Sequence, residues 1–115
     1  MNKYFWQMSF ILLIGVIVSG PLRAADAVKG KEIYEKKCAM CHAKDLKGNP
    51  AMAKVFKLDP SALSLVSKSV QDQKDADLIA TTTKGKGKMA AQEGKLSPDD
   101  IANSVAYIRS AANQK

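Results

Sequence analysis

The chain of 115 residues has 18 basic and 11 acidic residues, a formal net charge of +7, and is only 6% aromatic. This length and composition predict one small domain with a thin core, which a large apolar cofactor would complete. The basic excess does not indicate nucleic-acid binding, because Arg109 is the single arginine after residue 24 and no aromatic-rich basic stripe accompanies it.

The first 24 residues have the layout of a secretory signal peptide, with Lys3, an apolar run over residues 8–18, and small residues before Ala24. The apolar run is shorter than the ~20 residues that span a bilayer. We therefore expect cleavage after Ala24, with Ala27 as an alternative, and a domain of residues 25–115 in a bacterial periplasm. A retained N-terminal anchor facing the periplasm is the alternative.

The first predicted helix begins near Asp26 and runs to the first cysteine. Gly30, Tyr34 and Cys38 are spaced four apart, so they share one helix face. A glycine inside a helix costs about 1 kcal/mol relative to alanine. Its presence indicates that another element packs closely against this face.

The middle of the chain gives weaker signals. Residues 43–54 and 84–95 are predicted to be loops, because they are rich in glycine and charge. Residues 58–66 favour a short helix capped by Asp59 with Pro60 in first position. Residues 74–83 favour another helix, with three consecutive threonines predicting an early end.

The last predicted helix has the strongest signal. Ser97 is a good N-cap, Pro98 suits the first helical position, and two aspartates follow at the positive end of the helix dipole. Ile101 and Val105 lie on one apolar face with Ile108. No run of alternating β-branched and polar residues predicts a strand, so the sequence indicates an all-α fold.

The stretch CAMCH contains the only two cysteines, Cys38 and Cys41, and the only histidine, His42. Free thiols would be unusual in an exported chain. A disulfide exchanger of the thioredoxin type needs strands, and a closed zinc site needs four ligands. Covalent haem uses all three residues, because C-x-x-C-H is the pattern that attaches haem through two thioethers and ligates its iron through histidine. The sequence therefore predicts one covalently attached haem c.

A second axial ligand has to be something other than histidine, and methionine is the usual partner in electron carriers. Met40 lies inside the attachment motif and cannot reach the opposite haem face. Met52 follows His42 by only ten residues. Met89 lies in a glycine-rich loop before the last helix, so we predict that His42 and Met89 are the axial ligands.

The stretches GKEIYEKKCAMCH and GKGKMAAQEGKLSPDDIANSVAYIRS resemble the bacterial class I, monohaem cytochrome c family. The resemblance covers nearly all of residues 25–113. It implies the small cytochrome c fold, with four or five helices around one haem and crossing terminal helices that meet at Gly30, Tyr34 and Tyr107. It also implies that the carbonyl of Pro50 accepts a hydrogen bond from His42.

The same resemblance implies a monomeric electron carrier that acts between redox proteins and is not an enzyme. Family members often have proline directly after the ligand methionine, whereas this chain has Ala90, which predicts a less rigid loop. Two alternatives stay open at this point. One is a haem enzyme or gas-binding cytochrome with an open sixth position, and the other is a dedicated subunit of a larger respiratory or dehydrogenase complex.

Lysines surround the predicted ligand loop. We expect Lys84, Lys86 and Lys88 to form a docking patch for an acidic redox partner, because a basic patch would attract and orient such a protein. Lys44 and Lys47, just after the attachment motif, could extend this patch. The alternative is that these lysines only solvate a loop.

Overall fold

The computed structural model describes residues 24–114. The predicted signal peptide therefore lies, up to residue 23, outside the described residues, and its role stays a prediction. In the described range, no helix is both long and apolar enough to cross a membrane.

The two terminal helices begin where their capping residues predict. Helix α1 (Ala27–Lys37) starts after Asp26, whose carboxylate accepts hydrogen bonds from two backbone amides of the first turn. Helix α6 (Pro98–Ala112) starts after Ser97, which forms a reciprocal capping box with Asp100. Both predicted helices are confirmed.

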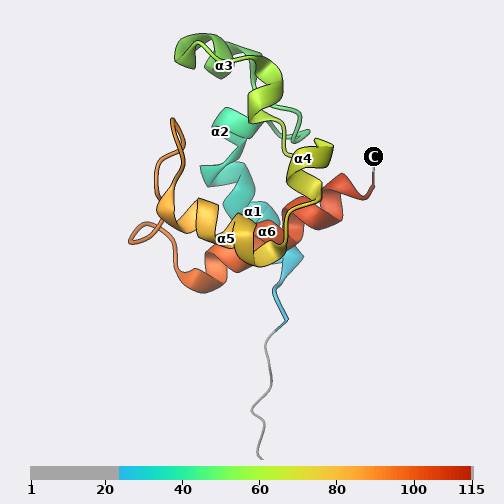
Figure 1. Ribbon diagram of the computed structural model, residues 1–115. Coiled ribbons are helices and arrows are strands. Elements are labelled where there is room, and N and C mark those ends of the chain that lie inside the picture. Colours follow the sequence, from blue (N-terminus) through green and yellow to red (C-terminus); the bar gives the residue numbers. More distant parts are fainter. Residues whose placement is uncertain (1–23, 115) are drawn as a thin grey trace, which may run out of the picture.

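These helices cross at Gly30 (Figure 1). A Cβ atom built on Gly30 would lie 1.8 Å from the carbonyl oxygen of Asn103, so only glycine fits at this point. Beside it, the rings of Tyr34 and Tyr107 pack with centroids 5.3 Å apart. The close packing expected from the glycine in the first helix is therefore confirmed, and α6 is the element that packs there.

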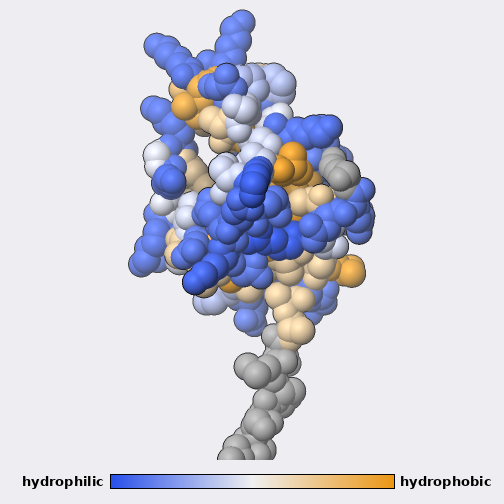
Figure 2. Space-filling model, turned by 45° about the vertical axis from the view of Figure 1, so that its right-hand side comes forward, coloured by the Kyte–Doolittle hydropathy of each residue, from blue (hydrophilic) through white to orange (hydrophobic). Residues whose placement is uncertain are grey.

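The core of the described range is small and is centred on this crossing. Its buried apolar side chains come from α1, α6 and the segments that follow the CAMCH motif, and they are Tyr34, Leu46, Ala53, Leu63, Ile101 and Val105. Large apolar residues such as Val28 and Val55 stay exposed. On the face drawn in Figure 2, hydrophilic residues dominate and apolar atoms form small separate patches.

Five short helical segments connect the terminal helices. They are α2 (Ala39–His42), α3 (Pro50–Phe56), the 3₁₀ turn η1 (Pro60–Leu63), α4 (Lys68–Gln71) and α5 (Asp75–Lys84). The described range thus has more helical segments than the four or five expected, because α2 and α4 are turns of only four residues. The all-α class is confirmed, since only two isolated bridges and no strand occur in residues 24–114.

Two local predictions in this part are wrong. Residues 50–56 form α3 rather than a loop, because Asn49 caps the helix and Pro50 takes its first position. The threonines do not end α5 early, since the helix runs to Lys84. Within it, the hydroxyls of Thr82 and Thr83 donate to the carbonyl oxygens four residues before them. The 3₁₀ turn after Asp59 and the irregular loop after Lys84 agree with the predictions.

Candidate haem site

The CAMCH motif forms the end of one helix and the whole of the next. Cys38 caps the C-terminus of α1, and Cys41 and His42 lie in the single turn of α2. The amides of Cys41 and His42 both donate to the carbonyl of Cys38, at 3.2 and 3.0 Å. One tight turn therefore holds both thiols and the imidazole together, as the motif predicts.

Both cysteines are free thiols and half-buried. Burial, followed by the neighbouring Cys41, raises the pKa of Cys38 to about 11. Neither thiol takes part in a disulfide in the described structure, so both are available for another bonding partner.

The imidazole of His42 is oriented by a backbone carbonyl. Its Nδ1 lies 2.7 Å from the carbonyl oxygen of Leu63, at the end of η1. A carbonyl can only accept, so Nδ1 carries the proton and Nε2 keeps its lone pair in the neutral ring. Burial lowers the pKa of His42 below its ordinary value, although the bond to Leu63 acts in the opposite direction. The ring is therefore held neutral, with one nitrogen available to a metal.

This arrangement corrects the assignment of Pro50. The acceptor of the His42 ring proton is Leu63, whereas Pro50 is the exposed first residue of α3. An N1 proline starts a helix, and its carbonyl is directed along the helix axis toward the next turn. The residue with the accepting carbonyl is thus found 21 residues after His42 rather than eight.

Residues 38–49, which we call the attachment segment, are fixed by several further hydrogen bonds. The hydroxyl of Tyr34 donates to the carbonyl of Ala43 at 2.6 Å, and so anchors the residue after His42, whose φ is positive at 64°. The side-chain amide of Asn49 donates to the carbonyl of Met40 at 2.8 Å. The role of Asn49 was not recognised from the sequence, although an Asn-Pro pair is a known helix-start signal.

Gly48, within the attachment segment, lets this segment pack closely against η1. Its amide donates to the carbonyl of His42 at 2.9 Å, and its φ is +96°. A Cβ atom at this position would lie 2.6 Å from the carbonyl oxygen of Pro60, so the glycine allows the two segments to approach. This approach places Leu63 against His42.

The predicted second ligand lies in residues 85–96, which we call the methionine loop. Met89 is half-buried, and its backbone pairs with Lys86 in both directions, at 2.9 and 3.0 Å. In Figure 1 this loop rises from the end of α5 to the level of α2. Of the other two candidates, Met52 is half-buried in α3 and Met40 is 69% exposed in α2.

The loop lysines differ from one another. Lys84 lies 3.5 Å from the carboxylate of Glu93, and both side chains are mostly exposed. Lys86 and Lys88 are exposed on the loop itself, as are Lys44 and Lys47 on the attachment segment. The predicted docking patch thus contains an acidic residue that sequence analysis did not include.

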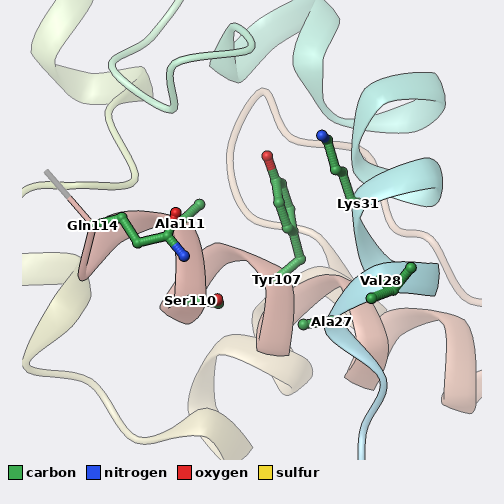
Figure 3. Close-up of a pocket in the computed structure, with 7 residues that line it drawn as sticks. All are labelled: Ala27, Val28, Lys31, Tyr107, Ser110, Ala111 and Gln114. Carbon is green, nitrogen blue, oxygen red and sulfur yellow. The ribbon is translucent and has the colours of Figure 1, made fainter.

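A shallow hollow between α1 and α6 is separate from these residues (Figure 3). It is lined by Ala27, Val28 and Lys31 from α1 and by Tyr107, Ser110 and Ala111 from α6, together with Gln114. None of the predicted haem residues lines this hollow. This hollow is therefore distinct from the predicted haem site.

The residues of the attachment segment fit a covalently bound haem. Two free thiols separated by two residues are the groups that two thioether bonds need, and Nε2 of the adjacent imidazole is uncommitted. Apolar side chains of the middle segments, among them Phe56, Val66, Leu78 and Ile79, are only half-buried. A large apolar group covering them would complete the thin core.

Comparisons with known proteins agree with this site. Residues 25–108 match the family described as cytochrome c oxidase, cbb3-type, subunit III. Over 114 residues the chain is 37% identical to cytochrome c6 of Picosynechococcus sp., covering 96% of this chain and 95% of that protein. It is also 34% identical to the cbb3-type cytochrome c oxidase subunit FixP of Bradyrhizobium sp., but it covers only 29% of that subunit.

The fold has a solved counterpart as well. The structure of cytochrome c6 from the diatom Phaeodactylum tricornutum superimposes with a TM-score of 0.59 at 27% identity, covering 77% of this chain and 97% of that one. The all-α cytochrome c fold expected from the sequence is thus confirmed. The chain belongs to the cytochrome c family, whose members carry covalently bound haem c and transfer electrons.

Proposed function

We propose that this cytochrome is a periplasmic shuttle, in which Cys38 and Cys41 attach one haem and His42 and Met89 ligate its iron. The observation that carries this proposal is the hydrogen bond between His42 Nδ1 and the carbonyl of Leu63 at 2.7 Å. It fixes the tautomer that offers Nε2 to a metal, as backbone partners of metal-binding histidines commonly do. The haem, when bound, supplies a one-electron ferric–ferrous couple.

The chain itself supplies attachment, orientation and shielding. The carbonyl of Leu63 holds the imidazole in one orientation, and Tyr34 anchors the next residue, Ala43, so the ligand position would not need to change between the two oxidation states. With Met89 as a second ligand, the haem iron would have no coordination position left for a substrate or a gas. On this assignment the chain has no enzymatic role.

The free-carrier assignment is supported by how much of each relative the chain covers. It spans 95% of the cytochrome c6 of Picosynechococcus sp. but 29% of the FixP subunit. A whole carrier is thus the better match than a piece of an oxidase subunit. We further propose that the carrier is monomeric and that an acidic face of its partner docks against the lysines around the methionine loop.

Export is the remaining part of this proposal. It rests on the charge, apolar run and small residues of the first 24 residues. Intact mass of the protein purified from an exporting bacterium should equal residues 25–115 plus one haem, or residues 28–115 with the alternative cut. A mass that includes residues 1–24 would instead show the retained anchor.

The ligand assignment is tested by the ferric near-infrared spectrum. Methionine sulfur bound to ferric haem iron gives a weak charge-transfer band, so Met89→Ala should abolish it and let cyanide or carbon monoxide bind. Met52→Ala removes an equally sized, half-buried methionine from α3 and is the matched control. Loss of the band in Met52→Ala but not in Met89→Ala would reverse the assignment.

A further inference from the structure

The carbonyl that orients His42 belongs to Leu63, the last residue of η1, and a short link leads from there to α4. Residues 63–65 make three hydrogen bonds in succession. Leu63 accepts from His42 Nδ1 at 2.7 Å, the amide of Leu65 donates to Leu46 at 2.7 Å, and the carbonyl of Leu65 accepts from the side chain of Gln71 at 2.6 Å. The position of the His42 acceptor therefore depends on a side chain in α4.

Gln71 is in turn held by α6. Nη1 of Arg109 donates to the backbone carbonyl of Gln71 at 2.8 Å and to its side-chain oxygen at 3.2 Å. Nη2 of Arg109 donates to the carbonyl of Gln73, and its Nε donates to the carboxylate of Asp75 at 2.8 Å. The guanidinium of Arg109 thus binds residues on both sides of and within the turn between α4 and α5.

The burial of Arg109 shows that this is more than a surface ion pair. Its side chain is only 20% exposed, whereas the carboxylate partner Asp75 is 66% exposed. Most of its hydrogen bonds go to neutral oxygens of the turn rather than to the acid. Lysine keeps the charge but lacks the planar set of donors that makes these bonds simultaneously.

We propose that Gln71 and Arg109 are positioning residues for the His42 imidazole, acting through residues 63–65. The proposal rests on His42 being an iron ligand, as proposed above. A hydrogen bond from Nδ1 to a carbonyl raises the basicity of a metal-bound imidazole. A more basic ligand favours the ferric state, so loosening residues 63–65 should raise the midpoint potential of the haem.

The test uses the haem-loaded protein and two variants that change the contacts without changing the charge. Gln71→Met removes both polar atoms of the side chain at similar length, and Arg109→Lys removes the fork. In both, we expect the midpoint potential to rise, the His42 Nδ1–H resonance to shift, and the Leu65 amide to exchange about tenfold faster, the factor expected for one lost hydrogen bond. If one variant fails to fold, the other still tests the proposal.

Two controls separate this route from a general loss of stability. Lys68→Gln breaks an exposed ion pair with Asp72 on α4, the helix that Gln71 ends, and should leave all three signals unchanged. Asp75→Asn removes the negative charge beside Arg109 but leaves both Gln71 contacts, so it should shift the Nδ1–H signal less than Arg109→Lys.

The outcomes distinguish this inference from the proposed ligation. If His42 does not ligate iron, the wild-type ferric protein will already lack a paramagnetically shifted His42 ring signal. If that signal is present but Gln71→Met and Arg109→Lys leave both it and the potential at wild-type values, the positioning role is overturned. An Asp75→Asn effect as large as that of Arg109→Lys, with Gln71→Met silent, would likewise exclude the route through Gln71.

Discussion

The attachment segment and the methionine loop carry the two predicted iron ligands, and the structure holds them by different means. Backbone hydrogen bonds join residues within the attachment segment, and one side chain and one backbone carbonyl from other elements hold it from outside. Tyr34 of α1 binds the carbonyl of Ala43, and the carbonyl of Leu63 binds the ring of His42. Gly48 brings η1 within contact distance. The His42 side is thus fixed by two elements besides its own, α1 and η1.

The methionine loop is held mainly by its own turn and by the helix just before it. Met89 pairs with Lys86, and the amides of Gln92 and Glu93 donate to the carbonyls of Thr82 and Thr83 near the end of α5. Each of these bonds joins residues close in sequence. Such contacts form and break together with the loop, so we expect the methionine side to yield first when the protein is stressed.

The largest effect should come from breaking the attachment segment at its covalent bonds. Changing Cys38 and Cys41 together to serine keeps the size of both side chains but removes both thioethers. The haem should then be lost completely on acid–acetone extraction, whereas it should stay with the wild-type chain. Serine variants of either cysteine alone are the matched controls and should keep one bond. Wild-type haem that washes out would exclude covalent attachment.

Features that depend on neighbouring residues in the sequence were predicted better than features that depend on distant ones. The starts of α1 and α6 depend on Asp26, Ser97 and their next few residues, and both were predicted correctly. The close packing at Gly30 was also foreseen, because a glycine inside a helix needs a packing reason. These signals are local and are visible in a single stretch of sequence.

The acceptor for His42 could not be read in the same way. Any residue presents a backbone carbonyl, so the sequence gives no chemical mark that distinguishes Leu63 from Pro50. The choice depends on how η1 returns against α2, which is a tertiary property. The contacts of Arg109 with Gln71 are 38 residues apart in sequence and escape prediction for the same reason. By contrast, α3 had a readable Asn-Pro start, and the neighbouring glycine and charges obscured it.

A smaller effect is expected from removing one hydrogen bond that holds the attachment segment, the bond from Tyr34 to Ala43. Tyr34→Phe deletes the hydroxyl that donates to Ala43 but keeps the ring that packs against Tyr107. The free energy of unfolding should fall by about 1–2 kcal/mol, because the bond is buried at one end and the carbonyl loses its partner. Chemical denaturation of the haem-loaded protein measures this loss.

Tyr107→Phe is the control for this change, because in the structure of residues 24–114 its hydroxyl makes no hydrogen bond while its ring belongs to the same pair. It should change stability much less than Tyr34→Phe. Equal losses from the two variants would mean that ring packing, and not the bond to Ala43, holds the attachment segment.

The methionine loop can be stiffened to reduce the difference between the two sides. At alkaline pH a neutral lysine can replace methionine on the iron, so the sulfur band should fade as pH rises. Ala90→Pro restricts the loop and costs no backbone bond, since the amide of Ala90 is not a donor in the described structure. A proline of this kind contributes about 0.4–1 kcal/mol, which should move the fading by about half a pH unit upward.

Replacing both Lys86 and Lys88 with glutamine tests whether one of these lysines is the ligand that displaces Met89 at alkaline pH. It should remove the alkaline transition or move it to clearly higher pH. Gln in place of Lys44 and Lys47, which lie on the attachment segment, should leave the transition where it is. A transition unchanged in the Lys86 and Lys88 variant would show that neither lysine replaces Met89.

The smallest effect concerns docking, where the two segments would contribute lysines to one patch. Lys84 lies 3.5 Å from Glu93, so part of its charge is cancelled within the loop, whereas Lys86 and Lys88 are exposed. We therefore expect Lys86→Gln with Lys88→Gln to slow electron transfer to an acidic redox protein by about threefold at low salt, and Lys84→Gln to slow it less, within the range for exposed charges. The wild-type rate should also fall as salt rises, because the Debye length is only about 10 Å at 0.1 M. The second-order rate across a salt series, with the haem spectrum as the check on the site, measures both effects. A rate that does not depend on salt, or a double variant that matches wild type, would leave these lysines as solvated surface. A Lys84→Gln effect equal to that of the double variant would mean instead that Glu93 does not mask this charge.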